Sequence, residues 1–100
     1  MAVAFVQEFP IIDDDRSTAN YDAVNDHVLA SGVPDGLVSH SAGFDEDAGV
    51  FRVFDIWESQ AHAQRFIDGT LMPFIQPALD SGAPPPARQG FYDLHNVVTP

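Results

Sequence analysis

The sequence predicts an α+β domain in which two helices cover one face of a four-stranded antiparallel sheet. Three observations lead to this prediction. Four β-rich segments alternate with two helical segments in the order β-α-β-β-α-β. Only a short polar loop joins the middle two β segments, as in a hairpin. The chain has 100 residues and no cysteine, which suits one domain with a modest core and excludes disulfide scaffolds and Cys-ligated metals.

The first strand and the first helix are predicted from the opening third of the chain. Residues 2–9 (AVAFVQEF) are β-rich and end at Pro10, which cannot donate to a sheet. Ser17 or Thr18 is expected to cap a helix that runs to about Ser31 and is closed by a glycine. One helix face is apolar through Tyr21, Val24, Val28 and Leu29.

A hairpin is predicted next, followed by a second helix and a last strand. Residues 37–44 (LVSHSAGF) and 50–57 (VFRVFDIW) form the hairpin, and Ser59 caps the helix. Gly69 and Pro73 should break or kink that helix, and a last helical turn or two ends near Ser81 and Gly82. Residues 90–98 (GFYDLHNVV) read as the final strand. This order of elements is the ferredoxin-like plan.

The predicted strands carry apolar side chains on both faces, although the helices can cover only one face. The third strand, for example, places Val53 and Trp57 on one side and Phe54 and Ile56 on the other. An uncovered apolar sheet face of this size is not expected on a soluble monomer. We therefore expect a homodimer in which two sheets pack against each other around a two-fold axis.

The charge of the chain excludes several classes of partner. Fifteen Asp and Glu residues face four Arg and no Lys, giving a net charge of -11, so binding to nucleic acid or to an anionic membrane is not expected. No apolar run approaches the ~20 residues that span a bilayer, and no signal peptide is visible. We therefore expect a cytoplasmic protein of a single domain spanning residues 1–100.

Three parts of the sequence carry a family resemblance. They are residues 36–43 (GLVSHSAG), residues 52–59 (RVFDIWES), and Phe66 with residues 71–73 (LMP). They resemble the dimeric α+β barrel superfamily and, more narrowly, its small antibiotic-biosynthesis-monooxygenase-like proteins. The most specific part is the strand-to-helix junction Trp57-Glu58-Ser59.

The resemblance implies a pocket in each subunit, between the sheet and its helices. Members use this pocket for cofactor-free oxygenation of aromatic polyketides, for polyketide cyclisation, or for haem chemistry. Haem-binding members carry a His late in the second helix, where this chain reads MPFIQ at residues 72–76. No cofactor is therefore expected, and the four histidines are too widely spread to predict a metal site.

His40 and Asp55 are the candidate catalytic pair. If Phe44 lies opposite Phe51 in the hairpin, His40 lies opposite Asp55, and Val38 lies opposite Trp57. A register shifted by one residue would instead place His40 opposite Phe54 and Asp55 opposite Ser39. The first register is preferred because it pairs an imidazole with a carboxylate, which would suit a general base or a purely structural pair.

The remaining candidates are less specific. His95 is a third candidate catalytic residue on the last strand, whereas His27 is expected in solvent and His62 at a rim. Arg52, in mid-strand, is expected to pair with an acid across the dimer or with an anionic substrate group. A flat substrate could be bound by aromatic side chains, which could equally be plain core: Phe5, Tyr21, Trp57, Phe66 and Tyr92.

The sequence thus favours a small-molecule pocket protein that takes a small apolar or aromatic ligand. One interpretation is a cofactor-free monooxygenase-like or cyclase-like enzyme acting on an aromatic or polyketide-type substrate through a His–Asp base. The alternative is a non-catalytic metabolite-binding or stress-related dimeric module. The residues leave open whether the protein is an enzyme.

Overall fold

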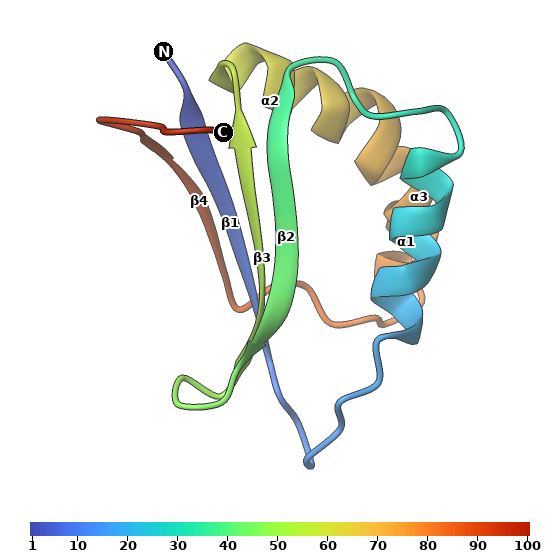
Figure 1. Cartoon of the computed structure of the whole chain (residues 1–100). Coiled ribbons are helices and arrows are strands. Elements are labelled where there is room, and N and C mark those ends of the chain that lie inside the picture. The colour runs from blue at the N-terminus through green and yellow to red at the C-terminus, as the bar shows by residue number, and fades with distance from the viewer.

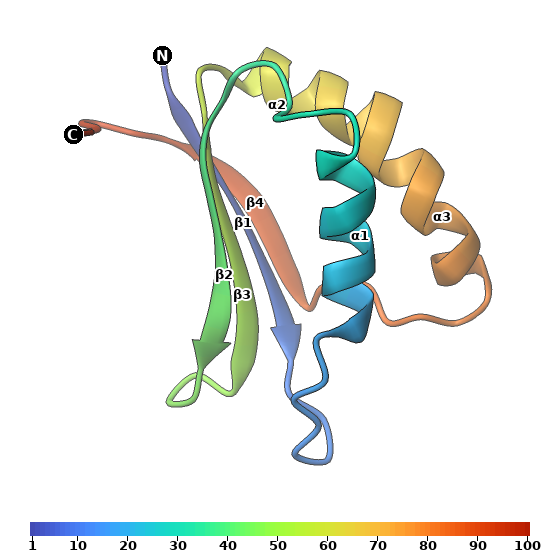
Figure 2. The same ribbon diagram turned by 45° about the vertical axis from the view of Figure 1, so that its right-hand side comes forward.

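All helices lie on one face of a four-stranded antiparallel sheet in the computed structural model, which describes residues 1–100 (Figures 1 and 2). The strands are ordered β2-β3-β1-β4. The predicted ferredoxin-like plan is confirmed. In chain order the elements are β1 (Val3–Pro10), α1 (Ala19–Leu29), β2 (Leu37–Asp45), β3 (Val50–Trp57), α2 (Gln60–Phe66), the π-helical η1 (Ile67–Leu71), α3 (Met72–Asp80) and β4 (Arg88–Asp93).

Helix α1 is shorter and less buried than its sequence pattern predicts. Thr18 is the N-cap residue, but its hydroxyl donates to the Asp22 side chain at 2.9 Å instead of capping a backbone N–H. The helix ends before Gly32, whose φ of +89° suits a residue without a Cβ. No residue of α1 is buried, and Leu29 of the predicted apolar face is 48% exposed. The helix therefore covers the sheet loosely.

The second helical segment bends without breaking at its glycine and proline. Ser59 caps α2 as predicted, because its Oγ accepts a hydrogen bond from the His62 backbone N–H at 3.2 Å. Gly69 lies within η1, a π-helical turn that carries the chain on into α3. Pro73 lies in the first turn of α3, directly after this π-helical turn. None of these helices is long and apolar enough to cross a bilayer.

Strand β4 occupies residues 88–93, not the predicted 90–98, because its partner strand ends. Asp93 pairs with Val3, the first residue of β1. The Leu94 N–H makes one more bond, to the Ala2 carbonyl at 3.0 Å. Beyond that point β1 offers no backbone to pair with, so the expectation that His95 lies on a strand is wrong.

The fully buried core is small and lies at one end of the layer between sheet and helices. Its cluster consists of Val3, Phe5, Trp57 and Ala63. Over the rest of this layer, apolar side chains from both helical segments are only half-buried, as Tyr21 and Ile75 illustrate. The face of the sheet toward the helices, called here the inner face, is therefore partly open to solvent around the middle of β2.

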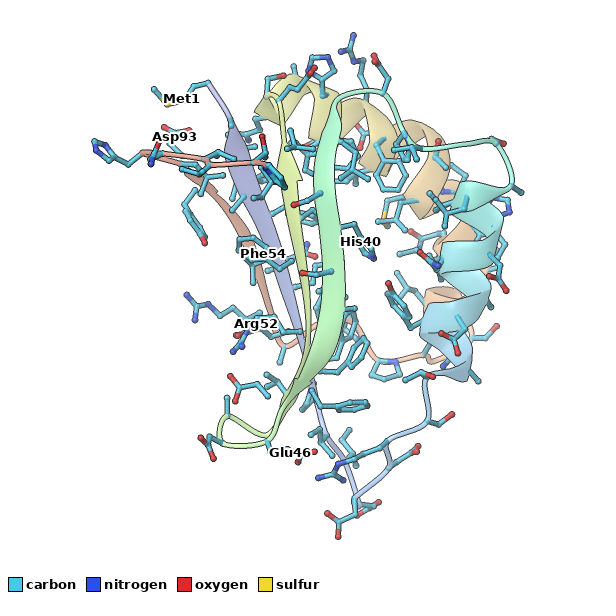
Figure 3. All side chains as sticks on the ribbon, in the orientation of Figure 1. Met1, His40, Glu46, Arg52, Phe54 and Asp93 are labelled. Atoms are coloured by element: carbon cyan, nitrogen blue, oxygen red, sulfur yellow. The ribbon has the colours of Figure 1, made fainter.

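The opposite face of the sheet, called here the outer face, is covered by no element of the chain (Figure 2). Figure 3 shows Arg52 and Phe54 projecting from this face, away from the helices. Val6 pairs with Phe54 in the β1–β3 register and shares the face, where both side chains are half-buried. As predicted, apolar side chains occupy both sides of the sheet.

Candidate functional site

The β2–β3 hairpin has the preferred register over most of its length. Phe44 pairs with Phe51, and His40 pairs with Asp55. The predicted pairing of Val38 with Trp57 is wrong, because Leu37 takes that place and the register shifts between Leu37 and Ser39. The extra residue of this bulge leaves Val38 40% exposed.

His40 and Asp55 form a hydrogen-bonded pair on the inner face. Figure 3 shows His40 pointing from β2 toward the helices. Its Nδ1 bonds to Oδ1 of Asp55, and the Asp55 side chain is 9% exposed against 30% for His40. This bond raises the pKa of His40 above its ordinary value, although partial burial acts in the opposite direction. With Nδ1–H donated to Asp55, the basic nitrogen of neutral His40 is Nε2.

Tyr21 of α1 extends this pair into a chain of three groups. Its hydroxyl lies 2.5 Å from Nε2 of His40, and the two rings are parallel to within 4°. Phe51 meets the Tyr21 ring edge-on, with centroids 5.4 Å apart. Burial, followed by the negative charges of Asp55 and Asp22, raises the pKa of Tyr21, so the phenol is neutral near pH 7.

The Tyr21–His40 bond was not predicted, although a signal for it exists. The sequence places Tyr21 on the apolar face of its helix and among the aromatic residues that could contact a ligand. A tyrosine that packs against a sheet generally needs a partner for its hydroxyl. His40 and His95 were both predicted on strands, and the helix-to-strand spacing that decides which of them Tyr21 contacts is a tertiary property.

Three of the other aromatic candidates, Phe5, Trp57 and Phe66, lie in the core or pack against it. Trp57 is 1% exposed and packs on Phe66 with ring centroids 5.2 Å apart. Phe5 stacks on Phe91 at 4.6 Å. Trp57 has one unusual property, because its buried Nε1–H has no hydrogen-bond partner. Buried donors are normally paired, so this N–H is an exception in the core.

Two predicted site residues do not lie near His40. His95 is exposed in the segment after β4, and β4 and β2 are opposite edges of the sheet. Three strand spacings separate these edges, or about 14 Å. Tyr92 pairs with Ala4, is 52% exposed and lies on the outer face, since its neighbour Phe91 packs inward on Phe5. Within one chain, Tyr92 therefore does not face the layer in which His40 lies.

Arg52 is paired within its own chain, an arrangement that neither expectation for it included. Its Nε donates to Glu8 at 2.8 Å and its Nη1 donates to Asp45 at 2.7 Å. The Arg52 guanidinium holds the pKa of the Asp45 carboxyl below its usual range. The cation is thus already neutralised on the outer face and requires neither a substrate anion nor an acid from a partner.

The other histidines have structural surroundings, and no metal centre is assembled. His27 is exposed on α1 and stacks on Phe74 of α3 with centroids 3.9 Å apart. The His62 ring accepts or donates a hydrogen bond with Ser59 Oγ at 2.7 Å, at the rim where it was expected. No group of three or more His, Cys, Asp or Glu side chains is arranged to hold a metal ion.

Known proteins resemble this chain in fold but hardly in sequence. No protein-family model matches it, and no curated protein matches it. SnoaB, a cofactor-independent oxygenase from Streptomyces nogalater, superposes with a TM-score of 0.66 at 16% identity, covering 97% of this chain and 96% of SnoaB.

Two further solved structures superpose over the whole chain. The NE2512 protein of Nitrosomonas europaea, of unknown function, gives a TM-score of 0.68 at 17% identity over 99% of this chain and 94% of its own. A putative antibiotic biosynthesis monooxygenase from Chloroflexus aurantiacus gives 0.60 at 13% identity over 99% and 98%. The chain has the fold of these proteins. The expected resemblance to antibiotic-biosynthesis-monooxygenase-like proteins is confirmed at that level.

Proposed function

We propose that this protein binds a small organic molecule on the inner face of its sheet and removes a proton from it. The observation that carries the proposal is the hydrogen-bonded chain Asp55–His40–Tyr21, which faces the partly open layer under the helices. A carboxylate fixes the imidazole tautomer and stabilises the imidazolium that forms. The cofactor-independent oxygenase activity stated for SnoaB supports the same type of chemistry on the same fold.

The reaction begins with an acidic C–H or phenolic O–H of the substrate. His40 is the base, and Asp55 acts through it as a positioning residue. The substrate bond to hydrogen breaks, the proton ends on Nε2 of His40, and the electron pair stays on the substrate as an enolate or phenolate. That anion then reacts with O2 without a cofactor, or it closes a ring by attacking a carbonyl within the same molecule.

The substrate we propose is flat, largely apolar and of the aromatic or polyketide type. The inner layer offers aromatic surfaces and few polar groups, and Trp57 Nε1–H is a buried donor without a partner. A donor fixed in a dry environment stabilises a developing oxyanion more strongly than water does. We assign this role to Trp57 instead of His95, which lies at the opposite sheet edge from His40.

The same proposal includes a homodimer formed through the outer face. Val6 and Phe54 line a hollow of about 480 Å³ on that face, together with Arg52 and Tyr92. The outer charges are already paired within the chain, so a second copy could cover the face without leaving Arg52 unpaired. The second copy would shield Val6 and Phe54 from water.

A second candidate function is binding without turnover, and one observation favours it. Both nitrogens of His40 are already engaged inside the molecule, by Asp55 and by Tyr21. In a purely structural network, each buried polar group is satisfied in this way. The protein would then hold a metabolite in the inner layer and leave it unchanged.

The two functions are separated by an assay with anthrone, a flat molecule whose ring C–H is acidic because its anion is an aromatic oxyanion. With O2, anthrone gives anthraquinone and water, which absorbance and oxygen uptake both follow. We expect the protein to accelerate this oxidation and His40→Gln to lose ~10²-fold or more of the acceleration. The control is His27→Gln, which changes an exposed histidine of the same chain and should leave the rate unchanged.

The outcome is informative in each case. If the wild-type protein binds anthrone, measured by fluorescence quenching of its single Trp, but leaves the oxidation rate at the buffer value, the binding function replaces the enzymatic one. If His40→Gln keeps full activity, a base other than His40 is responsible.

A further inference from the structure

The two nitrogens of His40 leave no free position for a substrate. Nδ1 bonds to Asp55, which is fixed in the core, and Nε2 is 2.5 Å from the Tyr21 hydroxyl. A substrate can therefore reach His40 directly only if Tyr21 moves away. The outermost polar atom of the chain Asp55–His40–Tyr21 is the phenol oxygen, not the imidazole.

We propose that Tyr21 is the catalytic residue that touches the substrate, and that it passes protons between the substrate and His40. This inference rests on the proposed function and changes the identity of the group in contact with the reacting atoms. When the Tyr21 O–H donates to Nε2, both lone pairs of its oxygen are free to accept. Tyr21 then presents an acceptor to the layer, backed by a base that accepts its proton.

The proton transfers balance in a single relay. The substrate C–H bond breaks and its proton bonds to the Tyr21 oxygen, while the original phenolic proton moves to Nε2 of His40. The electron pair of the C–H bond remains on the substrate as the enolate. Tyr21 is a neutral phenol before and after the step, and the positive charge appears on His40, next to the Asp55 carboxylate.

The surroundings of Tyr21 suit this role. Its ring is held by two contacts, parallel to His40 within 4° and edge-on to Phe51 at 66°. These contacts hold the Tyr21 oxygen beside Nε2, as a relay requires. The raised pKa of Tyr21 agrees with a phenol that does not ionise on its own and instead exchanges one proton for another.

The competing explanation is that Tyr21 only occupies Nε2 in the absence of substrate. Helix α1 contains no buried residue, so the substrate could displace the phenol and meet His40 directly. The two explanations make opposite predictions for Tyr21→Phe. Removing a relay hydroxyl interrupts proton transfer, whereas removing a blocking hydroxyl leaves Nε2 free and keeps or increases the rate.

The test measures anthrone oxidation by the wild-type protein, Tyr21→Phe, His40→Gln and the double variant. The relay predicts that each single variant loses ~10²-fold or more in kcat, and that the double variant loses no more than either, because the groups act as one unit. His27→Gln, on the same helix as Tyr21, is the control for disturbance of α1 and should keep its activity. Thermal unfolding verifies that each variant is folded.

A second readout identifies which proton moves. The phenolic proton exchanges with solvent, while the proton of freshly added anthrone is bound to carbon. The relay therefore predicts that kcat of the wild-type protein falls in D2O even when the substrate carries ordinary hydrogen. Direct removal by His40 moves only the carbon-bound proton and predicts no such decrease.

The possible failures are distinguishable. If the wild-type protein and His27→Gln accelerate the oxidation, His40→Gln does not, and Tyr21→Phe is as fast as wild type without a D2O effect, the relay is overturned and the His40 base stands. If the wild-type protein shows no acceleration, the proposed enzymatic function fails and the relay fails with it. Parallel loss in both single variants, with a slower wild-type reaction in D2O, supports the relay.

Discussion

The two faces of the sheet each carry a charged side chain, and the two side chains have different kinds of partner. Each carries a charged or titratable group amid apolar side chains, Asp55 on the inner face and Arg52 on the outer face. Asp55 is paired with His40, whose imidazole can gain or lose a proton. Arg52 is paired with Glu8 and Asp45, and its charge is permanent at any physiological pH.

This difference suits the inner face to a reaction and the outer face to contact with a second chain. A pair that includes an imidazole can change its protonation during a reaction, whereas an arginine with two carboxylates stays as it is. The inner face is also partly open to solvent beneath lightly packed helices. The outer face is uncovered, but the charge of Arg52 on it is already paired with carboxylates of the same chain. We infer that a ligand suits the first face and a second copy of the chain suits the other.

The largest expected effect comes from placing a charge on the outer face. Phe54→Asp would bury an unpaired carboxylate between two sheets, at a cost of roughly several kcal/mol, so the dimer should dissociate. Light scattering is expected to give about twice the chain mass of 10.9 kDa for the wild-type protein and a single chain mass for the variant. Gln60→Glu, which adds the same charge at the exposed start of α2, should remain a dimer.

Two results would contradict the inference that a second copy of the chain covers the outer face. A wild-type protein that is monomeric at micromolar concentration would leave the outer face without its proposed occupant. A Phe54→Asp variant that is still dimeric would move the interface to another surface. In neither case would the inner face be affected, because Phe54 projects away from the helices (Figure 3).

A smaller effect is expected from removing the buried carboxylate of the inner face. Asp55→Ala deletes the partner of His40 Nδ1 and should lower the free energy of unfolding by about 1–3 kcal/mol. The His40 side chain is 30% exposed, so water partly replaces the lost partner and keeps the effect below that of a fully buried pair. Urea unfolding at a fixed protein concentration measures this decrease in the free energy of unfolding.

The matched control for this variant is Asp47→Ala, in the exposed loop between β2 and β3. It removes the same charge from a solvated position and should change the unfolding midpoint little. Equal midpoints for the two variants would show that the His40–Asp55 bond contributes no stability.

Local pattern was sufficient to predict the fold and the pair at the centre of the site. The hairpin loop length and the facing Phe44 and Phe51 determine the register, and the register brings His40 to Asp55. The bulge at Val38 was not predictable, because no residue type at this position marks it. The end of β4 at Asp93 depends on where β1 begins, which is a property of the sheet and not of the β4 sequence.

The missed contacts are all tertiary. Tyr21 contacts His40 because α1 packs against β2 at a particular position along the strand. No spacing within the sequence encodes that position. Arg52 finds Glu8 across the β1–β3 register, which could be derived only once the two strands were known to be neighbours. The sequence thus predicted which residues form the site better than it predicted the contacts between them.

The smallest expected effect is the pH dependence that His40 gives to stability. Hydrogen bonding to Asp55 raises the pKa of His40 in the folded state above its ordinary value. The protonated imidazole therefore stabilises the fold, and this contribution is complete below an unfolded pKa near ~6.5 and is lost as the pH rises through the folded pKa. The difference in unfolding free energy between the wild-type protein and His40→Gln should accordingly shrink as the pH is raised from ~6.5 into the alkaline range. Arg52→Gln on the outer face should show no such trend over this range, because the arginine does not titrate there. If the difference for His40→Gln is also constant, the charge of the His40–Asp55 pair is as fixed as that of Arg52 and its partners.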